Sequence, residues 1–120
     1  MGIISAVVVL LLTLVGSALG DSQFRRDSSC PAGNVCFWSG HGTNAYENNK
    51  QTKSNTNPGW HPIGITAGSL KNAYGNRKVS FAESDSPNLW YCVDAGENRP
   101  DLTGYGNITY YNIGNMGSDC

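Results

Sequence analysis

Residues 30–42, CPAGNVCFWSGHG, gather two cysteines and a histidine, residue types that bind zinc through thiolate and imidazole groups. Five residues separate Cys30 from Cys36, whereas structural zinc sites space their paired cysteines by roughly two to four residues. Disulfide formation competes with metal binding, because oxidation removes the thiolates that a metal needs. The spacing therefore favours a structural disulfide, with no metal and no cofactor.

The cysteines predict a disulfide framework. Cys30, Cys36, Cys92 and Cys120 form an even set, which is typical of paired cystines in a small chain from an oxidising compartment. Four cysteines allow three pairings. We expect Cys30–Cys36 and Cys92–Cys120, because the first two are close and flanked by turn residues. The second pair would tie the C-terminus to a strand, and full pairing leaves no thiolate for covalent catalysis.

The remaining polar residues match no catalytic motif. The chain has two histidines, His41 and His61, and no serine lies in a nucleophile-elbow motif. The stretch ESDSPN (83–88) carries two carboxylates, but it is more typical of a polar turn than of a calcium loop. We therefore expect a protein that is not an enzyme.

Asn107 begins the acceptor sequon Asn-Ile-Thr and is the candidate glycosylation site. The alternative is an ordinary strand start without modification.

Residues 90–94, WYCVD, place an apolar side chain directly after a cysteine. An extended segment clamped by a disulfide suits a substrate-like protease inhibitor, since rigidity lowers the ordering cost of binding. The protease-contacting residues would be Tyr91, Cys92, Val93 and Asp94. The alternative is a core strand with a structural cystine, which residue alternation alone favours.

The first twenty residues form an apolar run that ends in small residues and has no charge before Asp21. We interpret 1–20 as a secretory signal peptide, with a membrane anchor as the alternative. Residues 21–29 follow as a flexible N-terminal segment or a short propeptide, since Arg25-Arg26 is a possible dibasic processing site. The mature protein is thus expected to be secreted and extracellular, with no membrane contact after signal cleavage.

Residues 30–120 are expected to form a single β domain, because this length suits one small domain. From Asp27 onward there are six basic and eight acidic residues, a net charge of −2. Such a chain has no electrostatic field to attract nucleic acid or an anionic membrane. We expect a monomer whose partner is another protein.

Short segments rich in β-forming residues alternate with Asn- and Gly-containing turns, which predicts an all-β sandwich or Greek-key domain. In 88–94 the alternation places Leu89, Tyr91 and Val93 on one face. Pro62 restricts its segment to an edge strand or an extended loop, and the polar stretch 48–59 is expected to be a long surface loop. The predicted strands cover residues 34–39, 60–65, 77–83, 88–94 and 107–113, separated by glycine-containing loops at 65–76 and 94–107.

Residues 30–42 resemble the N-terminal signature of the small secreted metalloproteinase inhibitors first known from streptomycetes. The shared pattern is Cys-Pro-Ala/Ser-Gly, a second cysteine six positions after the first, an aromatic strand and a glycine-containing turn. Ser69 and Asn72 are similar to a small-Ser-x-x-Asn element of that family. The matching positions within residues 30–42 are Cys30, Pro31, Ala32, Gly33, Cys36, Trp38, Ser39, Gly40 and Gly42.

This resemblance implies a βγ-crystallin-like Greek-key fold and inhibition of an extracellular protease of thermolysin type. It also implies a reactive bond at Cys92–Val93, since such enzymes prefer a bulky apolar residue after the cleaved bond. Two departures are visible: Asn48 stands where the crystallin turn has glycine, and the stretch GITAGS (64–69) has no acidic residue for a calcium motif.

The competing interpretation is a secreted antimicrobial, toxin-like, host-binding or carbohydrate-binding module on the same fold. A carbohydrate-binding module would need its aromatic residues on one exposed platform. The candidate aromatic residues are Trp60, Trp90, Tyr110 and Tyr111.

Overall fold

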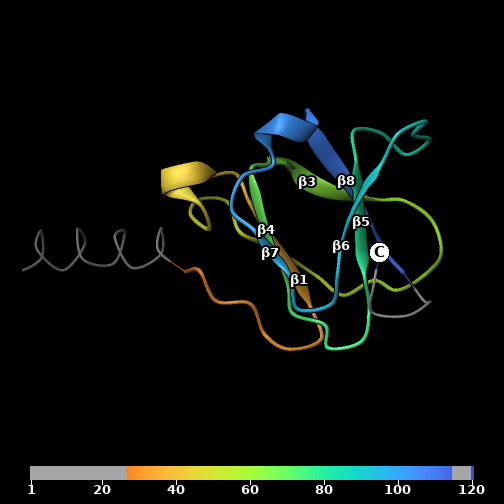
Figure 1. Cartoon of the computed structure of the whole chain (residues 1–120), viewed down its shortest axis with the longest axis horizontal. Coiled ribbons are helices and arrows are strands. Elements are labelled where there is room, and N and C mark those ends of the chain that lie inside the picture. The colour runs from red at the N-terminus through yellow and green to blue at the C-terminus, as the bar shows by residue number, and fades with distance from the viewer. Residues whose placement is uncertain (1–26, 115–119) are drawn as a thin grey trace, which may run out of the picture.

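The computed structural model describes residues 27–114 and residue 120, and the structural statements below refer to this part of the chain. The predicted signal peptide and residues 21–26 of the next segment lie outside it. Eight strands form two sheets that pack against each other (Figure 1). The strands are β1 (Val35–Trp38), β2 (Gln51–Lys53), β3 (His61–Ala67), β4 (Ser69–Asn72), β5 (Val79–Ala82), β6 (Tyr91–Val93), β7 (Asn98–Arg99) and β8 (Ile108–Ile113), with 3-10 helices η1 (Gly42–Asn44) and η2 (Thr103–Tyr105).

The fold is all-β, as predicted, and its strands exchange between the sheets. Sheet A has the order β2-β1-β4-β7, and sheet B has the order β3-β8-β5-β6. All neighbouring strands are antiparallel. The first half of the domain consists of β1 to β4 and the second half of β5 to β8. The third strand of each half, β3 or β7, therefore lies in the sheet that the other half forms. This exchange relates the two halves of the domain by an approximate two-fold repeat.

The equivalent first strands of the two halves show the repeat in their side chains. β1 reads VCFW and β5 reads VSFA. Val35 and Phe37 from β1 meet Val79 and Phe81 from β5 in one hydrophobic core, where all four are fully buried. Because strand side chains alternate between faces, the intervening residues point to the outer faces of the two sheets.

Several strand boundaries differ from the sequence prediction. The stretch 48–59 contains β2, and the predicted loop 65–76 contains the end of β3 and all of β4. Both segments are strands because β1 and β8 offer them partners, which local sequence does not reveal. The predicted strand 88–94 is shortened to β6. The predicted edge position of the Pro62 segment is confirmed, since β3 pairs only with β8.

The side chains of β8 do not alternate strictly between its two faces. Ile108, Tyr111 and Ile113 all lie in the core, although strict alternation would place Ile108 opposite the other two. The pairing of β3 with β8 shifts register between Pro62 and Ala67. A shift of this kind changes which face the following residues occupy.

The outer face of sheet A is covered by the chain's own N-terminal segment. Trp38 is almost fully buried, and its indole Nε1 donates a hydrogen bond of 2.9 Å to the carbonyl oxygen of Asp27. Lys71 donates to the carbonyl of Ser28, and Lys50 forms a 3.1 Å ion pair with Asp27. Residues 27–29, which the sequence assigns to the N-terminal segment, thus pack on the domain.

Both predicted disulfides are confirmed. Cys30 bonds to Cys36 and Cys92 bonds to Cys120, so no cysteine is free. Two disulfides in so small a domain are typical of an oxidising compartment. No helix within residues 27–114 is both long and apolar enough to cross a membrane.

Candidate functional site

The segment that the sequence singled out is strand β6, an edge of sheet B. Val93 is 0% exposed and belongs to the core, so its side chain does not reach a partner's pocket in this fold. Tyr91 is half-buried, with its ring 4.5 Å from the ring of Tyr105. Cys92 is half-buried in its disulfide, and Asp94 is exposed. The segment is thus a structural strand, and the apolar contact assigned to Val93 is not available there.

The loop before β6 is held at both ends. At its start, Glu83 accepts hydrogen bonds from the backbone N–H of Asn107 (2.7 Å) and, at its carbonyl, from the hydroxyl of Thr109 (3.0 Å). At its end, Cys92 is tied to Cys120. The loop of residues 83–90 projects beyond the sheets at the upper right of Figure 1. It is therefore an exposed segment on a rigid base.

This loop carries the large exposed apolar residues of the described chain. Leu89 is 66% exposed and Trp90 is 56% exposed. Sequence alternation placed Leu89 on one face of a strand with Tyr91 and Val93. The strand begins only at Tyr91, because the turn-forming residues Pro87 and Asn88 keep the preceding chain out of the sheet. The sequence signal for the exposure of Leu89 was the turn-forming pair Pro87-Asn88 directly before it.

Trp90 has an aromatic partner from a distant part of the chain. The ring centroids of Trp60 and Trp90 lie 6.4 Å apart, with an interplanar angle of 59°. Of the four aromatic residues proposed as an exposed set, Tyr111 does not belong, because it is buried in the core. Trp60 and Tyr110 are partly exposed.

A charged cluster supports the turn after β6. The carboxylate of Glu97 accepts a 2.9 Å hydrogen bond from the N–H of Asp94 and a 2.6 Å hydrogen bond from the guanidinium of Arg99. Arg99 also donates to the hydroxyl of Tyr105. The Asp94 N–H, and after it Arg99, hold the pKa of Glu97 below its ordinary value.

Glu97 is expected to make stability depend on pH. A carboxyl with a lowered pKa in the folded state stabilises the fold above its unfolded pKa, and this contribution disappears as the pH falls through the folded pKa. The difference in melting temperature between wild type and Glu97→Gln should therefore shrink as the pH is lowered from 7 through about 4.5 to below the folded pKa. Melting curves across this range check it, and a difference independent of pH would contradict it.

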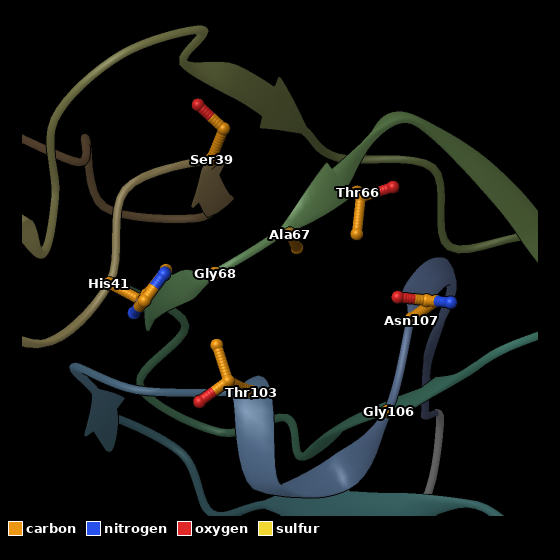
Figure 2. A pocket seen from close by; sticks show the side chains of 8 residues that line it. All are labelled: Ser39, His41, Thr66, Ala67, Gly68, Thr103, Gly106 and Asn107. Carbon is orange, nitrogen blue, oxygen red and sulfur yellow. The ribbon is translucent and has the colours of Figure 1, made fainter.

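A pocket of about 270 Å³ is lined by residues of β3, of η2 and of the neighbouring loops (Figure 2). Asn107, the predicted glycosylation site, is exposed at its rim, and the candidate histidine His41 lies on the opposite side. The lining residues are Ser39, His41, Thr66, Ala67, Gly68, Thr103, Gly106 and Asn107.

The pocket does not assemble a serine nucleophile beside a histidine. His41 Nδ1 lies 4.0 Å from Asp101 Oδ1. The hydroxyl of Ser39 points away from His41 in Figure 2; it donates to the carbonyl of Asn48 and accepts from the side chain of Asn49. Across residues 27–114 and 120, no group of three or more His, Cys, Asp or Glu side chains is placed to hold a metal ion.

Comparison of the chain with family models, with curated proteins and with solved structures gives no match.

Proposed function

We propose that this chain is a secreted, βγ-crystallin-like inhibitor of an extracellular metalloprotease of thermolysin type. The observation that carries the proposal is the exposed Leu89 in a loop whose ends are fixed by Glu83 and by the Cys92–Cys120 disulfide. The inhibitor signature in residues 30–42 supports the same function by resemblance.

Three observations support the crystallin-like form of the fold. Each half exchanges its third strand with the other sheet. Asn48, which replaces the glycine of the crystallin turn, has a φ of 67°, a region that asparagine tolerates better than most residues. Ser69 donates to the carbonyl of Gly40 and accepts from the N–H of Tyr46, so it ties the hairpin between β1 and β2 to β4.

In this proposal Leu89 takes the contact that the sequence assigned to Val93. The candidate reactive bond is Asn88–Leu89, which places a bulky apolar side chain directly after the bond. Because the loop is already anchored, binding to a protease cleft costs little ordering of the chain. The exposed Leu89 side chain fills the apolar pocket of the protease, and Trp90 covers the rim of the cleft.

The test is titration of a thermolysin-like protease with the oxidised, folded protein. Wild type should inhibit, and Leu89→Ser should weaken inhibition by roughly 30-fold or more, since truncating a central apolar contact costs about 2 kcal/mol or more. Leu89→Met is the matched control and should retain inhibition, because methionine keeps an apolar side chain of similar volume. The proposal fails if folded wild type does not inhibit, or if Leu89→Ser inhibits as well as wild type.

A further inference from the structure

The outer face of sheet B carries a row of side chains across three neighbouring strands. Pro62 of β3 lies opposite Tyr110 of β8, and Tyr110 lies opposite Ala82 of β5. Phe81 points into the core, so Ala82 points outward by alternation. Ala82 is nevertheless only 1% exposed. Other side chains must therefore cover this outer face.

Trp90, which is exposed, and Trp60, which is partly exposed, are placed to provide that cover. Trp60 directly precedes β3 and Trp90 directly precedes β6, and these strands are the opposite edges of sheet B. If the registers are continued by one residue, Trp60 falls opposite Asn112 and Trp90 falls opposite Ala82. Their rings lie 6.4 Å apart although β8 and β5 separate their strands. The pair therefore spans the outer face above Ala82.

The outer faces of the two sheets differ in how far their tryptophan side chains are covered. Trp38 of β1 stands at the position equivalent to Ala82 of β5 and is only 1% exposed. Its indole donates to the carbonyl of Asp27, and the side chains of Tyr46, Lys50 and Lys71 lie against its ring. On sheet B, Trp90 stays 56% exposed, and no segment of the described chain covers the tryptophan pair in the same way. The aromatic face of sheet B is thus available for a ligand.

The surroundings of the pair indicate the chemistry of that ligand. The flanking stretches 54–59 (SNTNPG) and 84–88 (SDSPN) offer amide and hydroxyl groups, and Asp85 is their only charged residue. Aromatic faces bury apolar surface, and neutral amides exchange hydrogen bonds with hydroxyl groups. A sugar ring presents both an apolar C–H face and a rim of hydroxyls. A single carboxylate in the two stretches offers no cluster of charge for a charged polymer.

We propose that Trp60 and Trp90 form a binding platform for a neutral, soluble polysaccharide. Two rings inclined at 59° cannot both lie flat on one plane, so the platform fits a twisted single chain better than a flat crystalline surface. Tyr110 lies beside the pair in the outer row, where it extends the apolar surface. This inference stands on the tryptophan pair and does not depend on protease inhibition.

The test is affinity electrophoresis of the oxidised full-length protein through gels containing laminarin, a soluble β-1,3-glucan, or hydroxyethyl cellulose. Wild type should be retarded by at least one of the two, and Trp60→Ala should weaken binding about tenfold or more. Leu89→Ser is the matched control, because it removes the neighbouring exposed apolar side chain, and it should bind glycan like wild type. Heparin and microcrystalline cellulose should bind no better than background.

Several results would overturn the platform. One is the absence of retardation in both glycan gels by protein whose melting curve shows a folded state. Another is unchanged retardation of Trp60→Ala. A third is a dimer in analytical ultracentrifugation that Trp60→Ala dissociates, since the pair would then serve as a contact between two copies. Loss of protease inhibition in Trp60→Ala without any glycan binding would assign the pair to the protease contact instead.

Discussion

Replacing Asn72 with leucine is expected to lower the free energy of unfolding by about 3–5 kcal/mol. The side chain is 1% exposed and makes three hydrogen bonds. Its amide donates to the carbonyls of Arg77 (2.8 Å) and Asp94 (3.0 Å), and its oxygen accepts from the N–H of Tyr74 (3.1 Å). Leucine has a similar volume but satisfies none of these backbone groups.

The position of Asn72 explains why the cost is large. It ends β4 in the first half of the domain, while Asp94 follows β6 in the second half. One amide thus joins sheet A to the turn after sheet B's edge strand. A buried group left without a partner costs about 1–3 kcal/mol. The replacement removes one hydrogen bond from each of three backbone groups, and the carbonyl of Asp94 keeps a second donor, the N–H of Glu97.

Urea unfolding of the oxidised protein measures this effect, with Asn98→Leu as the control. Asn98 is exposed on the edge strand β7, so the same replacement there should change stability by no more than about 0.5 kcal/mol. A loss below about 1 kcal/mol for Asn72→Leu would show that other groups or water replace its hydrogen bonds.

Removal of the Cys92–Cys120 disulfide by the double replacement with serine should cost about 3.6 kcal/mol in the chain-entropy model. The disulfide joins residues 28 positions apart, whereas Cys30 and Cys36 are only 6 apart. Removing the shorter disulfide should therefore cost less, about 2.2 kcal/mol. The order of these two costs, measured by urea unfolding, is the discriminating result. Equal costs, or a larger cost for the shorter loop, would contradict it.

The longer disulfide also bears on the proposed inhibition. Cys92 lies two residues after Trp90, so its disulfide anchors the end of the loop that carries Leu89. The double variant should inhibit less well than wild type under conditions in which both remain folded, because its loop must then be ordered on binding. Removal of Cys30–Cys36 should leave inhibition unchanged, since that disulfide lies beside sheet A.

Local sequence predicted the β class from residue type, and it predicted the disulfide pairing from the short spacing of Cys30 and Cys36 between turn residues. Strand-forming residues between Asn and Gly turns sufficed for the class, and Pro62 correctly restricted its segment to an edge. The boundaries of β2 and β4 were not predictable in this way. Their residues are strands because β1 runs between them and supplies hydrogen-bonding partners.

The candidate site was also predicted only in part from local sequence, and the rest of it depends on the tertiary structure. The sequence predicted WYCVD (90–94) as the protease-contacting segment, although residue alternation alone favoured a core strand there. Only the sheet pairing shows that Val93 is in the core and that Leu89, four residues earlier, is exposed. The partnership of Trp60 with Trp90 depends on two distant segments meeting across β8 and β5, and no local pattern encodes it.

By itself, the sequence determined an all-β, disulfide-bonded domain, because turn residues, strand formers and an even set of cysteines are local properties. The tertiary structure decided which apolar residues are buried and which face solvent. That choice depends on strand register and on the exchange of β3 and β7 between sheets, and one residue of register reverses the face of every side chain that follows.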